Sequence, residues 1–93
     1  MVFKAIKKPI VNEVIQFDGT KDGFKEIEEW AGVGIVQWMD LAFSHVIVVH
    51  TLEGNMILRK GDFIVKGIKG EVYPVNREIF LESYDMFDVM EFW

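Results

Sequence analysis

Apolar and polar residues alternate along this chain at two different spacings, and each spacing predicts a different element. Between residues 21 and 32 the apolar positions recur every three or four residues, which indicates an amphipathic helix. We expect this helix to begin near Asp22, whose carboxylate can accept hydrogen bonds from the following N–H groups, and to end at Gly32. Its apolar face holds Phe24, Ile27, Trp30 and Ala31.

Most of the remaining chain consists of short apolar runs, rich in β-branched and aromatic residues, which are typical of strands. Residues 45–51 are apolar on both alternating faces, which predicts a central strand covered on both sides. Turns at Gly54, Gly61 and Gly67/Gly70 separate the later runs, because glycine reaches positive φ without a steric penalty. The expected strands cover residues 2–7, 10–17, 35–39, 45–51, 55–59, 63–66 and 71–75, with Pro9 breaking the first two.

A second helix is expected to run from Arg77 to about Asp85, with Asn76 as its N-cap. Residues 88–93 add a last strand or pack as a tail. The sum is one α+β domain over residues 1–93, a bent antiparallel sheet of about five or six strands with two short helices on one side. The second helix should turn Ile79, Phe80 and Tyr84 inward.

Composition narrows the function classes. The chain has no cysteine, so disulfides and thiolate metal sites are excluded, and we expect no cofactor. A net charge of −5 argues against binding a nucleic-acid polymer, and no apolar run is long enough to span a membrane. Half of the residues are hydrophobic and 14% are aromatic, which predicts a homo-oligomer, a dimer or a tetramer. The aromatics outside the expected core faces are Trp38, Phe87, Phe92 and Trp93.

Catalysis is not expected, because nucleophilic chemistry needs an activated side chain beside a base. Ser44 adjoins His45, and Asp40 would have to complete a triad, but sequence neighbours seldom face each other. His45 and His50 are five residues apart on a strand, which places them on opposite faces and disfavours a shared metal.

A binding surface is the chemistry that these residues support best. Gly67 to Gly70 fits the GxxG spacing of a nucleic-acid clamp, but it lies between strands and is better interpreted as a hairpin turn. Cations near an aromatic ring can hold phosphates and stacked bases. The candidate ligand-binding residues are Tyr73, Lys66, Lys69, Arg77, Phe17, Trp38, Arg59 and Asn76. Packing of Tyr73 and Trp38, and solvation of the two lysines, are the structural alternatives.

Several motifs resemble a family of small phage and prophage proteins. They are residues 3–11, Gln16-Phe17, Leu52-Glu53-Gly54, Gly61-Asp62-Phe63-Ile64-Val65-Lys66-Gly67, Lys69-Gly70-Glu71-Val72-Tyr73-Pro74, and Phe80. The likeness covers most of the chain up to about Tyr84, whereas residues 33–44 and 86–93 match no motif of that family.

That family in turn resembles the phage sponge proteins that counter CBASS immunity. The resemblance implies an oligomer that sequesters a cyclic dinucleotide, such as cyclic GMP–AMP, in the host bacterial cytoplasm without cleaving it. The alternative is a phage host-takeover module that binds and inhibits a bacterial protein through an acidic, aromatic surface, which the negative charge also suits. A gain in melting temperature with cyclic dinucleotide separates the two hypotheses.

Overall fold

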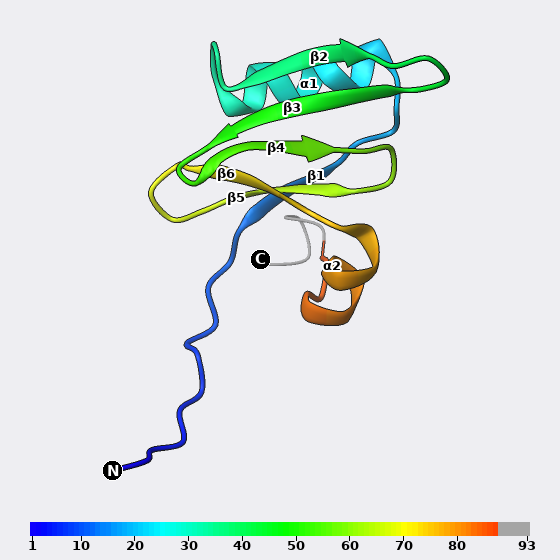
Figure 1. Cartoon of the computed structure of the whole chain (residues 1–93). Coiled ribbons are helices and arrows are strands. Elements are labelled where there is room, and N and C mark those ends of the chain that lie inside the picture. The colour runs from blue at the N-terminus through cyan, green and yellow to red at the C-terminus, as the bar shows by residue number, and fades with distance from the viewer. Residues whose placement is uncertain (88–93) are drawn as a thin grey trace.

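The structure, a computed structural model, describes residues 1–87 and contains six strands and two helices within them (Figure 1). The expected α+β class is therefore confirmed. In chain order the elements are β1 (Glu13–Gln16), α1 (Lys21–Ala31), β2 (Val36–Asp40), β3 (His45–Thr51), β4 (Gly54–Leu58), β5 (Phe63–Lys66), β6 (Val72–Val75) and α2 (Arg77–Ser83).

The strands form two antiparallel sheets of three, in the orders β1-β5-β6 and β2-β3-β4. The expectation of one sheet of five or six strands was wrong. Strand β6 lies beside β3 and β4 without pairing with them, and its Pro74 has no N–H to donate, which suits an edge position. Alternating apolar residues predict that a strand exists, but they do not say which neighbour it will pair with.

Strand β3 is the centre of its sheet, as predicted, and consecutive residues from Val46 to Val49 are buried. It pairs with β4 through a turn in which Thr51 faces Gly54, and Gly54 has a φ of 115°. The β5–β6 hairpin was also predicted correctly. Its turn contains Gly70 with a φ of 84°, which confirms that one of the two turn glycines has positive φ.

The larger apolar cluster lies between the two sheets and α1. Strand β3 supplies Ile47 and Val49, and α1 supplies the predicted Phe24 and Ile27. We call it the main cluster, and its buried members are Phe17, Phe24, Ile27, Val36, Ile47, Val49, Leu58, Ile64 and Val72.

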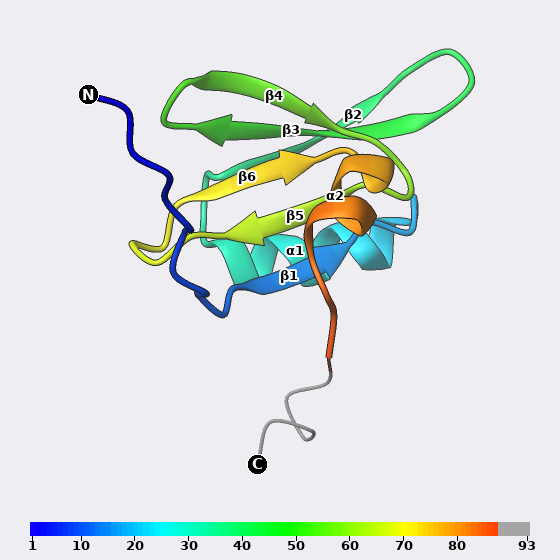
Figure 2. The same ribbon diagram turned by 90° about the horizontal axis from the view of Figure 1, so that it is seen from below.

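A smaller aromatic cluster covers the other face of the first sheet. Phe63 and Val65 of β5 pack there against Phe80 of α2, with Tyr73 and Tyr84 at its border. The rings of Phe63 and Phe80 are stacked with centroids 3.9 Å apart. The helices thus lie on opposite faces of the sheet rather than on one side, because β5 is apolar on both faces (Figure 2).

The helix ends differ from the prediction in detail. Helix α1 is capped by Thr20 rather than Asp22, because the Thr20 hydroxyl accepts from the Gly23 N–H at 3.0 Å. Gly32 ends that helix as predicted, with a φ of 107°. Asn76 is the N-cap of α2, also as predicted.

Helix α2 stops at Ser83, short of the predicted Asp85. Phe80 and Tyr84 face the sheet, but Ile79 is 58% exposed, so its predicted inward position was wrong. A helix of two turns has only one narrow face toward the sheet, and Phe80 occupies it.

Residues 1–12 contain no strand, and only 13–16 of the predicted 10–17 strand form β1. The predicted strand over 2–7 was wrong, because no strand among residues 13–87 pairs with this segment. Figure 1 shows it leaving the body of the protein in an extended path. The expected last strand or tail, with Phe92 and Trp93, lies outside the described residues.

Candidate functional site

The β5–β6 pairing separates two of the predicted ligand-binding residues. Lys66 lies opposite Val72, and Val65 lies opposite Tyr73. Opposite residues of an antiparallel pair share a face, and successive residues alternate. Lys66 and Tyr73 therefore emerge on opposite faces of the sheet and cannot flank one ligand within a single chain.

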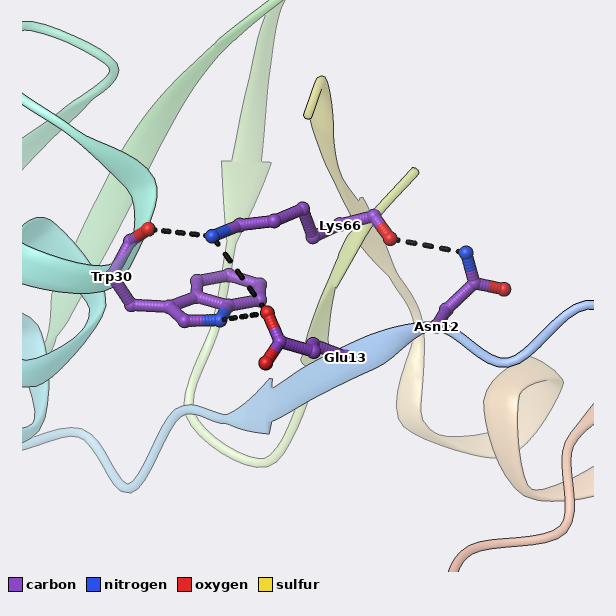
Figure 3. A network of polar contacts seen from close by, with 4 residues as sticks. All are labelled: Asn12, Glu13, Trp30 and Lys66. Atoms are coloured by element: carbon purple, nitrogen blue, oxygen red, sulfur yellow. Dashed lines mark hydrogen bonds and ion pairs between the residues drawn. The ribbon is translucent and has the colours of Figure 1, made fainter. Parts of the chain in front are cut away.

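Lys66 joins β5 to the end of α1 (Figure 3). Its Nζ donates to the Trp30 carbonyl at 2.7 Å, lies 4.4 Å from the Trp30 ring centroid and is 3.9 Å from Glu13 Oε1. Trp30 Nε1 in turn donates to Glu13, and Asn12 donates to the Lys66 carbonyl. The carbonyls of a last helical turn lack helical partners, so this ammonium satisfies one of them. Lys66 therefore has a structural role, because its side chain links β5 to the end of α1.

Tyr73 is half-buried at the border of the aromatic cluster. Burial, followed by its hydrogen bond with Tyr84, raises the pKa of Tyr73 to about 12. The residue also lines a cavity of about 350 Å³ between β6 and the β3–β4 turn, together with Glu53 and Glu71. Two carboxylates in that lining disfavour an anionic ligand.

Neither predicted stacking platform presents an open ring. Phe17 is 1% exposed in the main cluster. Trp38 packs edge-on against Phe17 and Phe24, while the His45 ring stacks on it at 4.8 Å and Lys21 Nζ lies 4.5 Å from its centroid. A base would have to displace groups of the protein itself to stack on Trp38.

Asp40 and His45, two members of the disfavoured Ser44 triad, do lie together. Asp40 Oδ1 accepts from Trp38 Nε1 at 2.8 Å and lies 2.7 Å from His45 Nδ1. These hydrogen bonds, with the Trp38 bond first, lower the pKa of the Asp40 carboxyl. Within residues 1–87 no hydrogen bond joins the Ser44 hydroxyl to His45, so the geometry does not complete a triad.

His50 pairs separately with Asn55, at 2.6 Å. The described part of the chain contains no group of three His, Cys, Asp or Glu side chains that could hold a metal ion.

Three of the predicted residues converge where the β4–β5 turn meets α2. The Asp62 carboxylate accepts from the backbone N–H of Arg59 at 3.2 Å and of Arg77 at 3.1 Å. Asn76 caps α2 beside them, accepting from Glu78 N–H at 2.9 Å. We call Arg59, Asp62, Asn76 and Arg77 the arginine corner.

Within the described residues, neither guanidinium group of the arginine corner forms an ion pair with a carboxylate. Among the ion pairs of residues 1–87, none involves Arg59 or Arg77. The Asp62 carboxylate accepts from two backbone N–H groups instead, so it fixes the backbone of the corner without pairing with either guanidinium. This role of Asp62 was not predicted from the sequence. The signal was present, since an Asp in a glycine turn commonly accepts from nearby backbone groups.

Lys69 lies at the other end of the β5–β6 hairpin from the arginine corner. Its backbone N–H donates to Glu71 Oε2 at 3.1 Å within the turn. The four residues of β6 span roughly 13 Å at about 3.3 Å each. Lys69 and Arg77 therefore belong to separate ends of the hairpin.

In comparisons with known proteins, no family model, curated protein or solved structure matches the chain. No helix among residues 1–87 combines the length and the apolar character needed to cross a membrane.

Proposed function

We propose that this chain is a phage-encoded sponge that binds a cyclic dinucleotide, such as cyclic GMP–AMP, and thereby blocks CBASS signalling in the host bacterial cytoplasm. The observation that supports the proposal most is the arginine corner, where Asp62 binds the backbone N–H groups of both Arg59 and Arg77. Neither guanidinium forms an ion pair with another residue in the described part of the chain. The ligand class comes from the resemblance of the motifs to phage sponge proteins.

The corner suits the chemistry of such a ligand. Guanidinium groups bind phosphate through two parallel hydrogen bonds, and their flat faces stack on purines. Effective capture must compete with a receptor, so we expect nanomolar affinity, roughly −12 kcal/mol. One chain supplies two arginines at this corner, whereas the ligand has two phosphates and two bases. A dimer, or a tetramer built from dimers, that brings two corners to one ligand doubles these contacts.

The test is thermal stability in the presence of a cyclic-dinucleotide panel. Ligand at 100 times its Kd should stabilise the native state by about 2.7 kcal/mol, and so raise the melting temperature by several degrees. Arg59→Ala and Arg77→Ala should each weaken binding at least tenfold. The matched control Lys25→Ala removes an exposed cation of α1, away from the corner, and should bind as the parent does.

Mass spectrometry of the released ligand tests capture without turnover. The cyclic dinucleotide should be recovered intact after denaturation of the complex. Linear dinucleotide or mononucleotide would make the protein an enzyme, and the absence of any bound nucleotide would reject the sponge.

The second candidate function is the host-takeover module, and the β2–β3 turn favours it. Phe43 is fully exposed there, next to the half-exposed Leu41. Helix α1 adds an acidic exposed surface through Glu26, Glu28 and Glu29. Under this proposal a bacterial protein co-purifies with the parent chain and with Arg77→Ala but not with Phe43→Ser, while cyclic dinucleotides leave the melting temperature unchanged.

A further inference from the structure

The N-terminal segment of residues 1–11, which we call the arm, exposes side chains that a folded chain normally covers. It has no regular secondary structure, and Figure 1 shows it extending away from both sheets. Val2 is 94% exposed, Phe3 80% and Ile6 96%. These apolar groups lie close together in an extended segment, so covering them would be favourable.

The arm and the rest of the chain carry opposite charges. The arm holds Lys4, Lys7 and Lys8 and no acidic residue, which gives it a charge of +3. The remaining residues contain seven Lys or Arg against fifteen Asp or Glu, a net charge of −8. Another copy of this chain therefore offers the arm an acidic surface.

An apolar groove of about 450 Å³ lies between the root of the arm and α2. Phe80, Tyr84 and Met86 form one wall, and its acidic groups are Glu13 and Asp85. Met86 is 57% exposed, so part of this apolar wall faces solvent. The groove thus combines the apolar and acidic character that complements Phe3, Ile6 and the lysines of the arm.

The arm is poorly suited to fill the groove of its own chain. Pro9 to Val14 form the opposite wall, so Phe3 could return only if the chain reversed direction between residues 4 and 8. That stretch, Lys-Ala-Ile-Lys-Lys, contains none of the Gly, Asn, Asp or Ser residues that form tight turns. Pro9 also biases Lys8 toward an extended backbone.

We propose that the arm of one copy seats Phe3 and Ile6 in the groove of a second copy, and that the exchange is reciprocal. Eleven extended residues span up to about 36 Å, which is enough to reach across to a neighbouring subunit. In a dimer with twofold symmetry each arm occupies the groove of the other copy, so the assembly is closed and no arm or groove is left unoccupied. This assembly does not rest on the proposed ligand.

Disulfide trapping tests the exchange directly, because the chain has no cysteine of its own. In a variant carrying Ile6→Cys and Met86→Cys, oxidation should link two chains, giving twice the 10.8 kDa chain mass on a non-reducing gel. Mixing the two single-cysteine variants should give the same linked pair. Val33→Cys with Met86→Cys is the control, since Val33 is equally exposed but far from the arm in sequence.

Only a link between chains supports the exchange. A link confined within one chain would show that the arm folds back, and the absence of a link, or equal linking of the control, would overturn the proposal.

Light scattering supplies an independent readout. Phe3→Asp with Ile6→Asp should convert the parent dimer into a monomer, while Val33→Asp should leave it dimeric. These positions are exposed and make no core contact, so circular dichroism should show the parent fold in all three proteins. A monomeric parent at micromolar concentration, including one that binds anionic vesicles through the arm, would overturn the exchange.

Discussion

The two faces of sheet β1-β5-β6 are covered in very different ways. The main cluster buries nine residues from both sheets, α1 and the β1–α1 loop, whereas the aromatic cluster buries only Phe63, Val65 and Phe80. Strand β5 contributes to both, with Ile64 on one face and Val65 on the other. Cooperative stability should therefore come from the main cluster, while α2 depends on a few aromatic contacts and its cap.

The largest expected effect is in the main cluster. Ile47 on the central strand is fully buried, so Ile47→Ala should cost about 2–5 kcal/mol of unfolding free energy. A chain of this size should then melt at least about 10 °C lower. Ile57→Ala, on the neighbouring strand and 37% exposed, is the control and should cost far less. Equal urea midpoints for the two variants would show that β3 is not the centre of the core.

The turn of the β5–β6 hairpin tests the pairing of two strands in sheet β1-β5-β6, which lies between the two clusters. Gly70 has a φ of 84° and open space around it, so Gly70→Ala should cost about 1–2 kcal/mol through backbone strain alone. Backbone amides of residues in both clusters should then exchange hydrogen faster than in the parent. Lys69→Ala in the same turn should change stability by less than about 0.5 kcal/mol. If Gly70→Ala melted with the parent, the turn geometry would be refuted.

The cap of α2 should show a smaller and more local effect. Asn76 accepts from the N–H groups of Glu78 and Ile79, so Asn76→Ala should cost about 1 kcal/mol. Amides of α2 should exchange faster, while those of β3 keep the protection of the parent. Glu82→Ala, at an exposed position of the same helix, is the matched control. Uniform loss of protection would mean that α2 unfolds only together with the main cluster.

Local chemistry made much of the fold predictable. The spacing of Phe24 and Ile27 indicated α1, the apolar run of β3 indicated a central strand, and Asn76 indicated the start of α2. Strand partners were not predictable in the same way, because β6 has the composition of a strand whichever edge it joins. In the arm, a strand was predicted that did not form, because its residues favour a strand but no strand of the described residues pairs with it.

The candidate site was less predictable than the fold, because binding depends on which face a side chain leaves from. Lys66, Lys69, Tyr73 and Arg77 are close in sequence, yet the hairpin sends Lys66 and Tyr73 to opposite faces. Arg59 and Arg77 are far apart in sequence and meet through Asp62.

The smallest effect concerns the border of the aromatic cluster, where Tyr73 has a pKa raised to about 12. Burial is the first cause and Tyr84 the second, so Tyr84→Phe should lower the pKa of Tyr73 while keeping it above the usual value of about 10. The fold favours the neutral phenol. Its contribution to stability is therefore complete below about pH 10 and is lost as pH rises through the folded pKa.

Ultraviolet titration measures this pKa directly, because the chain has two tyrosines and Tyr84→Phe leaves only Tyr73. The control Glu71→Gln removes the weakest of the causes and should leave the pKa of Tyr73 close to that of the parent. The phenol of Tyr73 is buried by Phe63, Val65 and Phe80, and the Tyr84→Phe variant retains all three. A Tyr73 that titrates near pH 10 in Tyr84→Phe would mean that the aromatic cluster admits water and does not desolvate the phenol.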